Sequence, residues 1–162
     1  MQRDFPTLND DWKEEIGRHR QVRGHDFDNN ELAAAALPAM ARMRESVPGL
    51  YAVALGTGDG MHVCSLGLPD SLAASEISAL SSSMLGVAEA QGRVQRPDQG
   101  DAQPGIVTIS RPNNEFVSLV KIDHAPVGHL VLTIFARETQ LGMVVYHARQ
   151  QAKEMSDWLS EE

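Results

Sequence analysis

Three apolar segments in the second half of the chain are joined by turns so short that they constrain the fold more than any other feature. The segments span residues 105–110, 115–122 and 127–135, and each connection is four residues long. Connections of this length join neighbouring strands in antiparallel order and leave no room for a crossover. The last segment is apolar on both sides, as in a strand at the middle of a sheet. We therefore expect an antiparallel sheet covered on both faces.

Two further strands are expected earlier in the chain. Apolar runs at residues 50–55 and 61–66 flank Gly58-Asp59-Gly60, and Asp-Gly between such runs indicates a hairpin because glycine supplies the positive φ of the turn. The surrounding GTGDG could be mistaken for a phosphate-binding loop. A strand rather than a helix follows it, and no Lys-Ser/Thr pair is present, so we expect no nucleotide site there.

Three amphipathic helices complete the predicted order of elements. The first follows Asn30 and contains Pro38, which predicts a kink or a restart of the helix. The second covers residues 72–91 and the third follows Thr139. The fold class is therefore α+β, with a five-stranded antiparallel sheet. The central helix should cover one face, and the first and last helices the other.

The central helix carries two candidate stripes. Large apolar residues at the spacing of a core-facing surface are predicted to face the sheet: Leu72, Ile77, Leu80, Met84 and Val87. Small residues recur at steps of three and four on another side: Ser75, Ser78, Ser82, Gly86 and Ala90. Because glycine and serine lower helix propensity, such a stripe should have a packing reason. A neighbouring sheet, the same helix of a second subunit, or a merely solvated face would each account for it.

The first 29 residues differ from the rest, which divides the chain into an extension at residues 1–29 and one domain at residues 30–162. The extension is polar and poor in aliphatic residues. Phe5, Leu8, Trp12 and Ile16 fall at helical spacing and predict a short amphipathic helix. This helix would lie on the domain or on a subunit neighbour, or would act as a detachable latch for a partner.

Composition excludes several classes of function. A net charge of -8 argues against nucleic acid as the main partner. The chain has no run of 18 apolar residues and no apolar segment behind a basic start, so we expect neither membrane insertion nor a signal peptide. A single cysteine fits a reducing compartment. The expected location is the cytoplasm.

No catalytic, metal or cofactor site is predicted. The six histidines are scattered without metal-ligand spacing on a helix face. Asp123, His124 and His129 share one hairpin, but turn histidines are mostly solvated. Cys64 follows His62 on the same side of a strand, yet nothing indicates the electropositive, accessible setting of a reactive thiol. We therefore expect a non-enzyme.

The order of these elements resembles the roadblock / dynein light chain family. The hairpin that opens the family's domain matches Val47-Pro48-Gly49-Leu50 and Asp59-Gly60, and its closing helix matches Leu141-Gly142 with Arg149. The resemblance covers residues 31–159 and departs from the family at Pro38 and in the N-terminal extension. It implies a profilin-like α/β/α sandwich and is nearest to the bacterial, GTPase-associated branch.

What the resemblance implies about function is a non-catalytic regulatory or scaffold module. Such a module forms a homodimer and binds or regulates a small Ras-like GTPase. The family joins edge strands and packs central helices side by side, which implies this interface: Ser75, Ser78, Ser82, Gly86, Ala90, Ile106, Val107, Thr108 and Ile109. The alternative is a small-ligand sensor, because related sandwiches hold ligands between sheet and helix, here with residues 92–103 as the lid.

Overall fold

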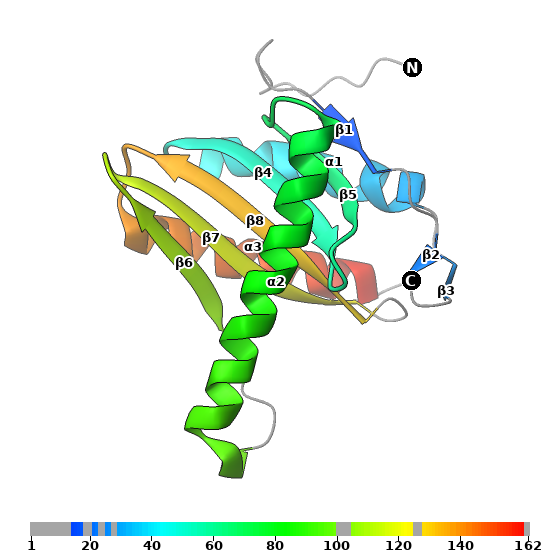
Figure 1. Ribbon diagram of the computed structural model, residues 1–162. Coiled ribbons are helices and arrows are strands. Elements are labelled where there is room, and N and C mark those ends of the chain that lie inside the picture. The colour runs from blue at the N-terminus through cyan, green and yellow to red at the C-terminus, as the bar shows by residue number, and fades with distance from the viewer. Residues whose placement is uncertain are drawn as a thin grey trace.

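A computed structural model describes residues 14–17, 21–22, 25–26, 29–99, 105–124 and 128–160. Three helices and a large sheet form the described part of the chain (Figure 1). The helices are α1 (Asn29–Ser46), α2 (Ser71–Gln95) and α3 (Leu141–Ser160), with a 3-10 turn, η1, at Pro97–Gln99. The large sheet contains β1 (Glu14–Ile16), β4 (Leu50–Thr57), β5 (His62–Leu66), β6 (Ile106–Arg111), β7 (Glu115–His124) and β8 (Gly128–Arg137).

The large sheet is antiparallel throughout, in the order β1-β5-β4-β8-β7-β6. The five predicted strands are all present, and β8 lies near the middle with seven consecutive buried residues. The predicted count of five is wrong because β1 adds a sixth strand beside β5. The turn between β6 and β7 places Asn113 and Asn114 at positive φ (67° and 57°), a conformation that asparagine tolerates well.

The N-terminal extension differs from its prediction wherever it is described. Ile16 belongs to β1 and not to a helix, because pairing with β5 satisfies its backbone along an otherwise open edge. Two short strands, β2 (Gln21–Val22) and β3 (His25–Asp26), form a separate hairpin. Phe5, Leu8 and Trp12 lie outside the described residues. The division at residue 29 remains a prediction.

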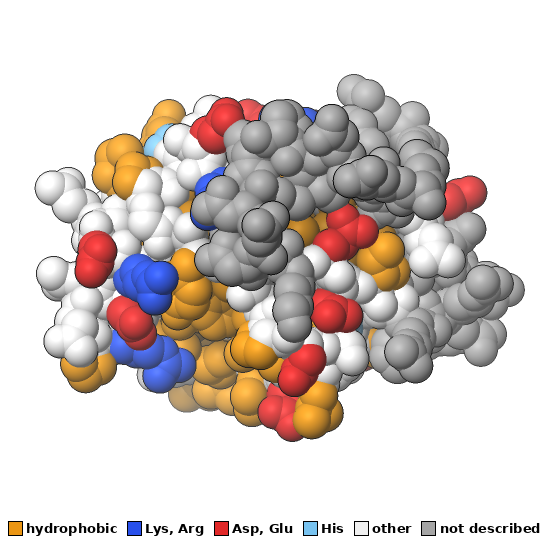
Figure 2. All heavy atoms as spheres, turned by 90° about the horizontal axis from the view of Figure 1, so that it is seen from above, with side chains coloured by type: hydrophobic (Ala, Val, Ile, Leu, Met, Phe, Trp, Pro, Cys, Tyr) orange, Lys and Arg blue, Asp and Glu red, His pale blue; other side chains and the backbone are white. Residues whose placement is uncertain are grey.

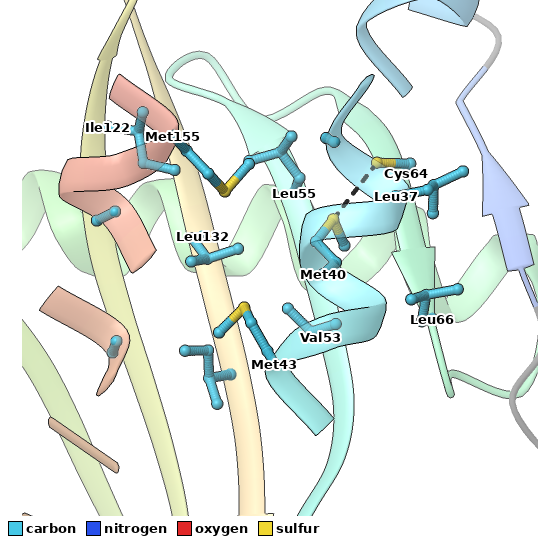
Figure 3. Close-up of a cluster of buried hydrophobic side chains, with 14 of the residues drawn as sticks. Leu37, Met40, Met43, Val53, Leu55, Cys64, Leu66, Ile122, Leu132 and Met155 are labelled. Carbon is cyan, nitrogen blue, oxygen red and sulfur yellow. Dashed lines mark hydrogen bonds between the residues drawn. The ribbon is translucent and has the colours of Figure 1, made fainter. Parts of the chain in front are cut away.

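The helices cover the sheet as predicted, with α2 on one face and α1 and α3 on the other (Figure 1). The main core lies between the sheet and the α1/α3 layer. Leu37, Met40 and Met43 of α1 are fully buried against Leu55 of β4 and Leu132 of β8 (Figure 3). Large aliphatic and sulfur-containing side chains fill this layer, which is the usual composition of a close-packed interior.

The helix boundaries show where local signals hold. Helix α1 runs through Pro38 as one element, so the predicted restart is wrong. Asp70 caps α2, accepting a hydrogen bond from the Ala73 N–H at 2.8 Å. Helix α2 continues to Gln95, so the predicted loop is wrong for residues 92–95, and residues 100–104 lie outside the described part. Among described helices, none is both long and apolar enough to cross a membrane.

Candidate interaction surface

Helix α2 faces the sheet with its small residues. The buried positions of α2 are Ala74, Ser78, Ser81 and Leu85, at steps of four, three and four. The Ser81 hydroxyl accepts a hydrogen bond at 2.8 Å from the Thr133 hydroxyl of β8. The Ser78 hydroxyl is buried and has no partner in the described structure. The contact between α2 and the sheet is therefore made by few, mostly small side chains and is partly polar.

The strand beneath α2 explains this orientation. Ala52, Ala54 and Gly56 of β4 lie toward α2, whereas Val53 and Leu55 belong to the main core. A Cβ atom added to Gly56 would lie 3.1 Å from the Ser78 Cβ, closer than nine in ten real contacts of this kind. Small residues on both sides let the helix approach the strand closely, and dispersion contacts favour such an approach.

The same approach continues at the tip of the β4–β5 hairpin. The Ser82 hydroxyl donates a hydrogen bond to the Gly58 carbonyl oxygen. A Cβ atom at Gly60 would lie 3.3 Å from the Ala79 Cα. Farther along the helix, the Lys121 ammonium of β7 pairs with the Glu89 carboxylate at 3.2 Å. The small stripe predicted from the sequence thus has its packing reason partly within this chain.

Apart from Leu85, the buried residues of α2 are small, and four of its large apolar residues face outward. Leu72, Leu80, Val87 and Val94 are 66%, 57%, 68% and 83% exposed. The prediction that Leu72, Leu80 and Val87 face the core is therefore wrong. Ile77 and Met84 lie at the margins and are half-buried. We call the exposed residues Leu72, Leu80, Val87 and Val94 the α2 outer stripe.

Strand β6 supplies a second open feature near this helix. Among the described residues it is the last strand of the sheet and is bonded to β7 alone. Its first four residues, Ile106 to Ile109, are half-buried, and none is charged. In Figure 1, α2 extends past the end of the sheet on the side where β6 lies. An unpaired, β-branched edge is the kind of edge to which another strand adds.

The residues predicted for a dimer interface occupy three different environments. Ser78 and Ser82 contact the β4–β5 hairpin within the chain. Ser75 and Gly86 are exposed, and a Cβ atom at Gly86 would meet nothing within 4 Å. Ala90 and the β6 residues 106–109 are half-buried. Gly86 thus lies on the free side of α2 together with the outer stripe.

The outer stripe has a sequence signal that was assigned to the wrong side. Leu80, Val87 and Val94 are spaced by seven residues, the repeat of a helix that packs on another helix. The signal for the inward face lies in β4, where alternate residues are Ala52, Ala54 and Gly56. A strand that presents only small residues on one face suits a helix that does the same.

The residues weighed for catalysis have structural partners. The His62 Nε2 lies 3.2 Å from the Ser65 hydroxyl, and the Cys64 thiol donates to the Met40 sulfur at 3.7 Å in the main core (Figure 3). Both residues are buried. Within the described ranges, no group of three or more His, Cys, Asp and Glu residues could hold a metal ion.

A cavity of about 530 Å³ opens at the end of the sheet where β4 begins and β8 ends. Arg44, Arg137 and Glu138 line it together with Tyr51. The Arg137 guanidinium lies 4.9 Å from the Tyr51 ring centre, within the range of a cation–π contact. Burial, and secondarily the Glu115 carboxylate, raises the pKa of the Tyr51 phenol.

Figure 2 views this end of the molecule and shows hydrophobic side chains beside charged ones.

Comparison with solved structures places this architecture among known folds. A Roadblock/LC7 domain from Streptomyces avermitilis is 21% identical, with a TM-score of 0.57 over 75% of this chain and 95% of that one. The gliding protein MglB from Thermus thermophilus is 13% identical, with a TM-score of 0.64 over 80% and 91% of the two chains. An MglB structure with a tetrameric arrangement is 14% identical, with a TM-score of 0.63 over 79% and 90%.

These similarities establish the fold. The chain has the roadblock/LC7 architecture, as the resemblance in its sequence predicted. No family model matches the chain, and no curated protein sequence is detectably similar to it.

Proposed function

We propose that this chain is a non-catalytic regulatory or scaffold module that acts as a homodimer and binds a small Ras-like GTPase. One observation carries the homodimer: the open edge of β6 lies near a helix that exposes four large apolar side chains. Two copies related by a two-fold axis would pair β6 with β6 and would cover the outer stripe. The dimer interface would use Ile106 to Ile109, Gly86, Ala90, Leu80, Val87 and Val94.

The chemistry of these residues supports the proposed interface. Pairing β6 across two copies would satisfy backbone groups that an edge strand otherwise leaves to water. A two-fold axis brings the same surface of both copies together. A contact of this kind forms a closed dimer and leaves no equivalent surface free for a third copy. Gly86 offers open space on the free side of α2, which would let a second helix approach closely. Ser78 and Ser82 are outside this interface because they contact the hairpin.

The solved structures and the sequence resemblance support the remaining parts of the proposal. One MglB structure has a tetrameric arrangement, so a protein of this fold self-associates. The sequence resemblance points to the GTPase-associated branch of the family, and the GTPase partner rests on that resemblance. The buried Cys64 and the hydrogen-bonded His62 fit a module without catalysis.

Substitution of Val87 by glutamate tests the homodimer. Sedimentation equilibrium of the wild-type chain should give twice its 17.7 kDa mass. An unpaired buried carboxylate costs about 3 kcal/mol or more, so Val87→Glu should raise the dimer dissociation constant by about 100-fold or more. Tyr146→Glu on α3 is the matched control, since Tyr146 is also exposed (61%) but lies on the other layer. A wild-type monomer, or equal effects of both variants, would contradict the dimer.

Affinity capture with a nucleotide comparison tests the GTPase partner. Tagged protein would be incubated with host lysate with GDP or with a non-hydrolysable GTP analogue, and captured proteins would be identified by mass spectrometry. A Ras-like GTPase enriched with one nucleotide should then bind the purified chain with the same nucleotide preference. Absence of any such GTPase under both conditions would contradict this part of the proposal.

The cavity beside Tyr51 favours a second candidate function, the sensing of a small oxyanion ligand. Its volume falls within the range of small-molecule sites. When a guanidinium stacks on a ring, its N–H groups remain directed outward in its own plane, where a phosphate or carboxylate can accept them. Thermal unfolding with inorganic phosphate, against chloride at equal ionic strength, tests this function. Stabilisation that Arg137→Gln abolishes would support it, and an unchanged melting temperature would contradict it.

A further inference from the structure

The two ends of the sheet are built differently. Strand β6 has six residues, and its first four carry no charge. Strand β1, at the other end, has three residues, and two of them are Glu14 and Glu15. Charged residues and short length are devices that make an edge strand a poor template for further pairing. The β1 end therefore resists strand addition, while the β6 end invites it.

Strand β1 covers the edge of the buried strand β5. It pairs with β5 in the register Glu14 to Leu66 and Ile16 to Cys64, and the Gly17 N–H donates to the Val63 carbonyl oxygen at 2.7 Å. All five residues of β5 are buried. Ile16 packs against the main core. Without β1, the buried strand β5 would become the edge of the sheet.

We propose that β1 closes the β5 edge against β6 of a second copy, so that assembly through the sheet stops at two chains. Strands β5 and β6 lie toward opposite ends of one sheet. A β6-to-β5 contact is therefore head-to-tail and repeats from copy to copy, whereas a β6-to-β6 contact closes on a two-fold axis. The end point of two chains rests on the homodimer proposed above.

Competition between the two strands favours β1 only because β1 is part of the same chain. The β6 strand is twice as long as β1 and could offer more backbone hydrogen bonds to β5. An intramolecular strand, however, is present at a high effective concentration that a second copy does not reach in dilute solution. Loss of the Ile16 contact, or of the strand itself, removes that advantage and opens β5 to β6.

Two variants test this proposal. Ile16→Asp in the full chain removes the side chain that packs β1 on the core, and deletion of residues 1–17 removes the strand. Sedimentation velocity at increasing concentration should give an average mass that rises beyond twice the chain mass for both. In these variants, amide hydrogen exchange should show protection of β5 that rises with protein concentration, while β6 stays protected. Any variant that retains a cooperative thermal transition is informative.

The outcomes separate this proposal from the homodimer. Folded variants with the wild-type mass at every concentration would overturn closure by β1 and leave the homodimer intact. Growth without protection of β5 indicates unspecific aggregation and also overturns it. A monomeric wild-type chain would contradict the homodimer, while growth of the variants with protected β5 and β6 would still support closure of the β5 edge.

Discussion

The two faces of the sheet are packed by different means. On the α1/α3 face, Leu, Met and Ile side chains from two helices and four strands form one buried core. On the α2 face, the helix contacts the sheet through Ala74, Ser78, Ser81 and Leu85, with one buried hydroxyl left without a described partner. Apolar burial is the main stabilising term in folding, so the first face should supply most of the stability.

The contrast indicates how one helix can serve two surfaces. Small inward residues hold α2 close to the strands, and four large apolar residues lie on its outer side. The α1/α3 layer has no comparable stripe among its described residues, and its exposed large residues Leu141, Met143 and Tyr146 lie near the start of α3. The face that contributes less to the core therefore exposes the larger apolar surface to a partner. Exposed apolar stripes of this kind mark interaction sites.

The largest difference between the faces should appear on truncating one leucine from each. Leu132 is fully buried under α1 and α3, and Leu132→Ala should lower the free energy of unfolding by about 2–5 kcal/mol because a cavity remains. Leu80→Ala removes the same atoms from an exposed side chain (57%). It should change the free energy of unfolding by less than about 0.5 kcal/mol. Urea unfolding at low protein concentration measures both. Equal losses would remove the contrast.

Within the α2 face, two serines should respond in opposite directions. Ser81→Ala removes the acceptor of the Thr133 hydroxyl and should destabilise the chain by about 1–3 kcal/mol. Ser78→Ala removes a buried hydroxyl without a described partner and should stabilise it by about 1 kcal/mol. Both are one-atom deletions on the same helix, which makes each the control for the other. Thermal unfolding that shows the same sign for both would contradict the assignment of the hydrogen bonds.

The smallest effect is expected at Gly86, on the outward side. A Cβ atom there meets nothing within 4 Å, so Gly86→Ala should stabilise the single chain by about 0.5–1 kcal/mol through helix propensity. Chemical unfolding at protein concentrations too low for dimer formation measures this change in the free energy of unfolding of the single chain. A loss of stability under those conditions would show that Gly86 packs against the chain's own residues.

Much of the fold could be predicted because its determinants are local. Four-residue turns make consecutive strands antiparallel, and Asp70 caps α2 through its own side chain. The orientation of α2 was not predictable from its own sequence, since a stripe of large residues and a stripe of small residues could each form its inward face. The choice depends on β4, where Ala52, Ala54 and Gly56 make close approach possible. This contact joins segments far apart in the sequence, and the periodicity of a single segment cannot predict it.

The sixth strand was missed for a related reason. Glu14 to Ile16 is short and polar, so its sequence carries no strand signal. It forms a strand because β5 offers an unpaired edge, and pairing satisfies backbone groups on both sides. For the proposed interface, the sequence prediction and the family resemblance named Gly86, Ala90 and β6, which stay a prediction, and the sequence prediction placed Leu80 and Val87 in the core.

Hydrogen exchange of the β6 amides as a function of protein concentration tests the proposed homodimer most directly. In the described part of the chain, strand β6 is bonded to β7 alone, so part of its N–H groups would face solvent in a single chain. If β6 pairs with β6 of a second copy, peptides covering Ile106–Arg111 should exchange quickly at high dilution. At high concentration they should become protected, while the β4 peptides stay unchanged. Rapid exchange in β6 at every concentration would contradict the proposed homodimer.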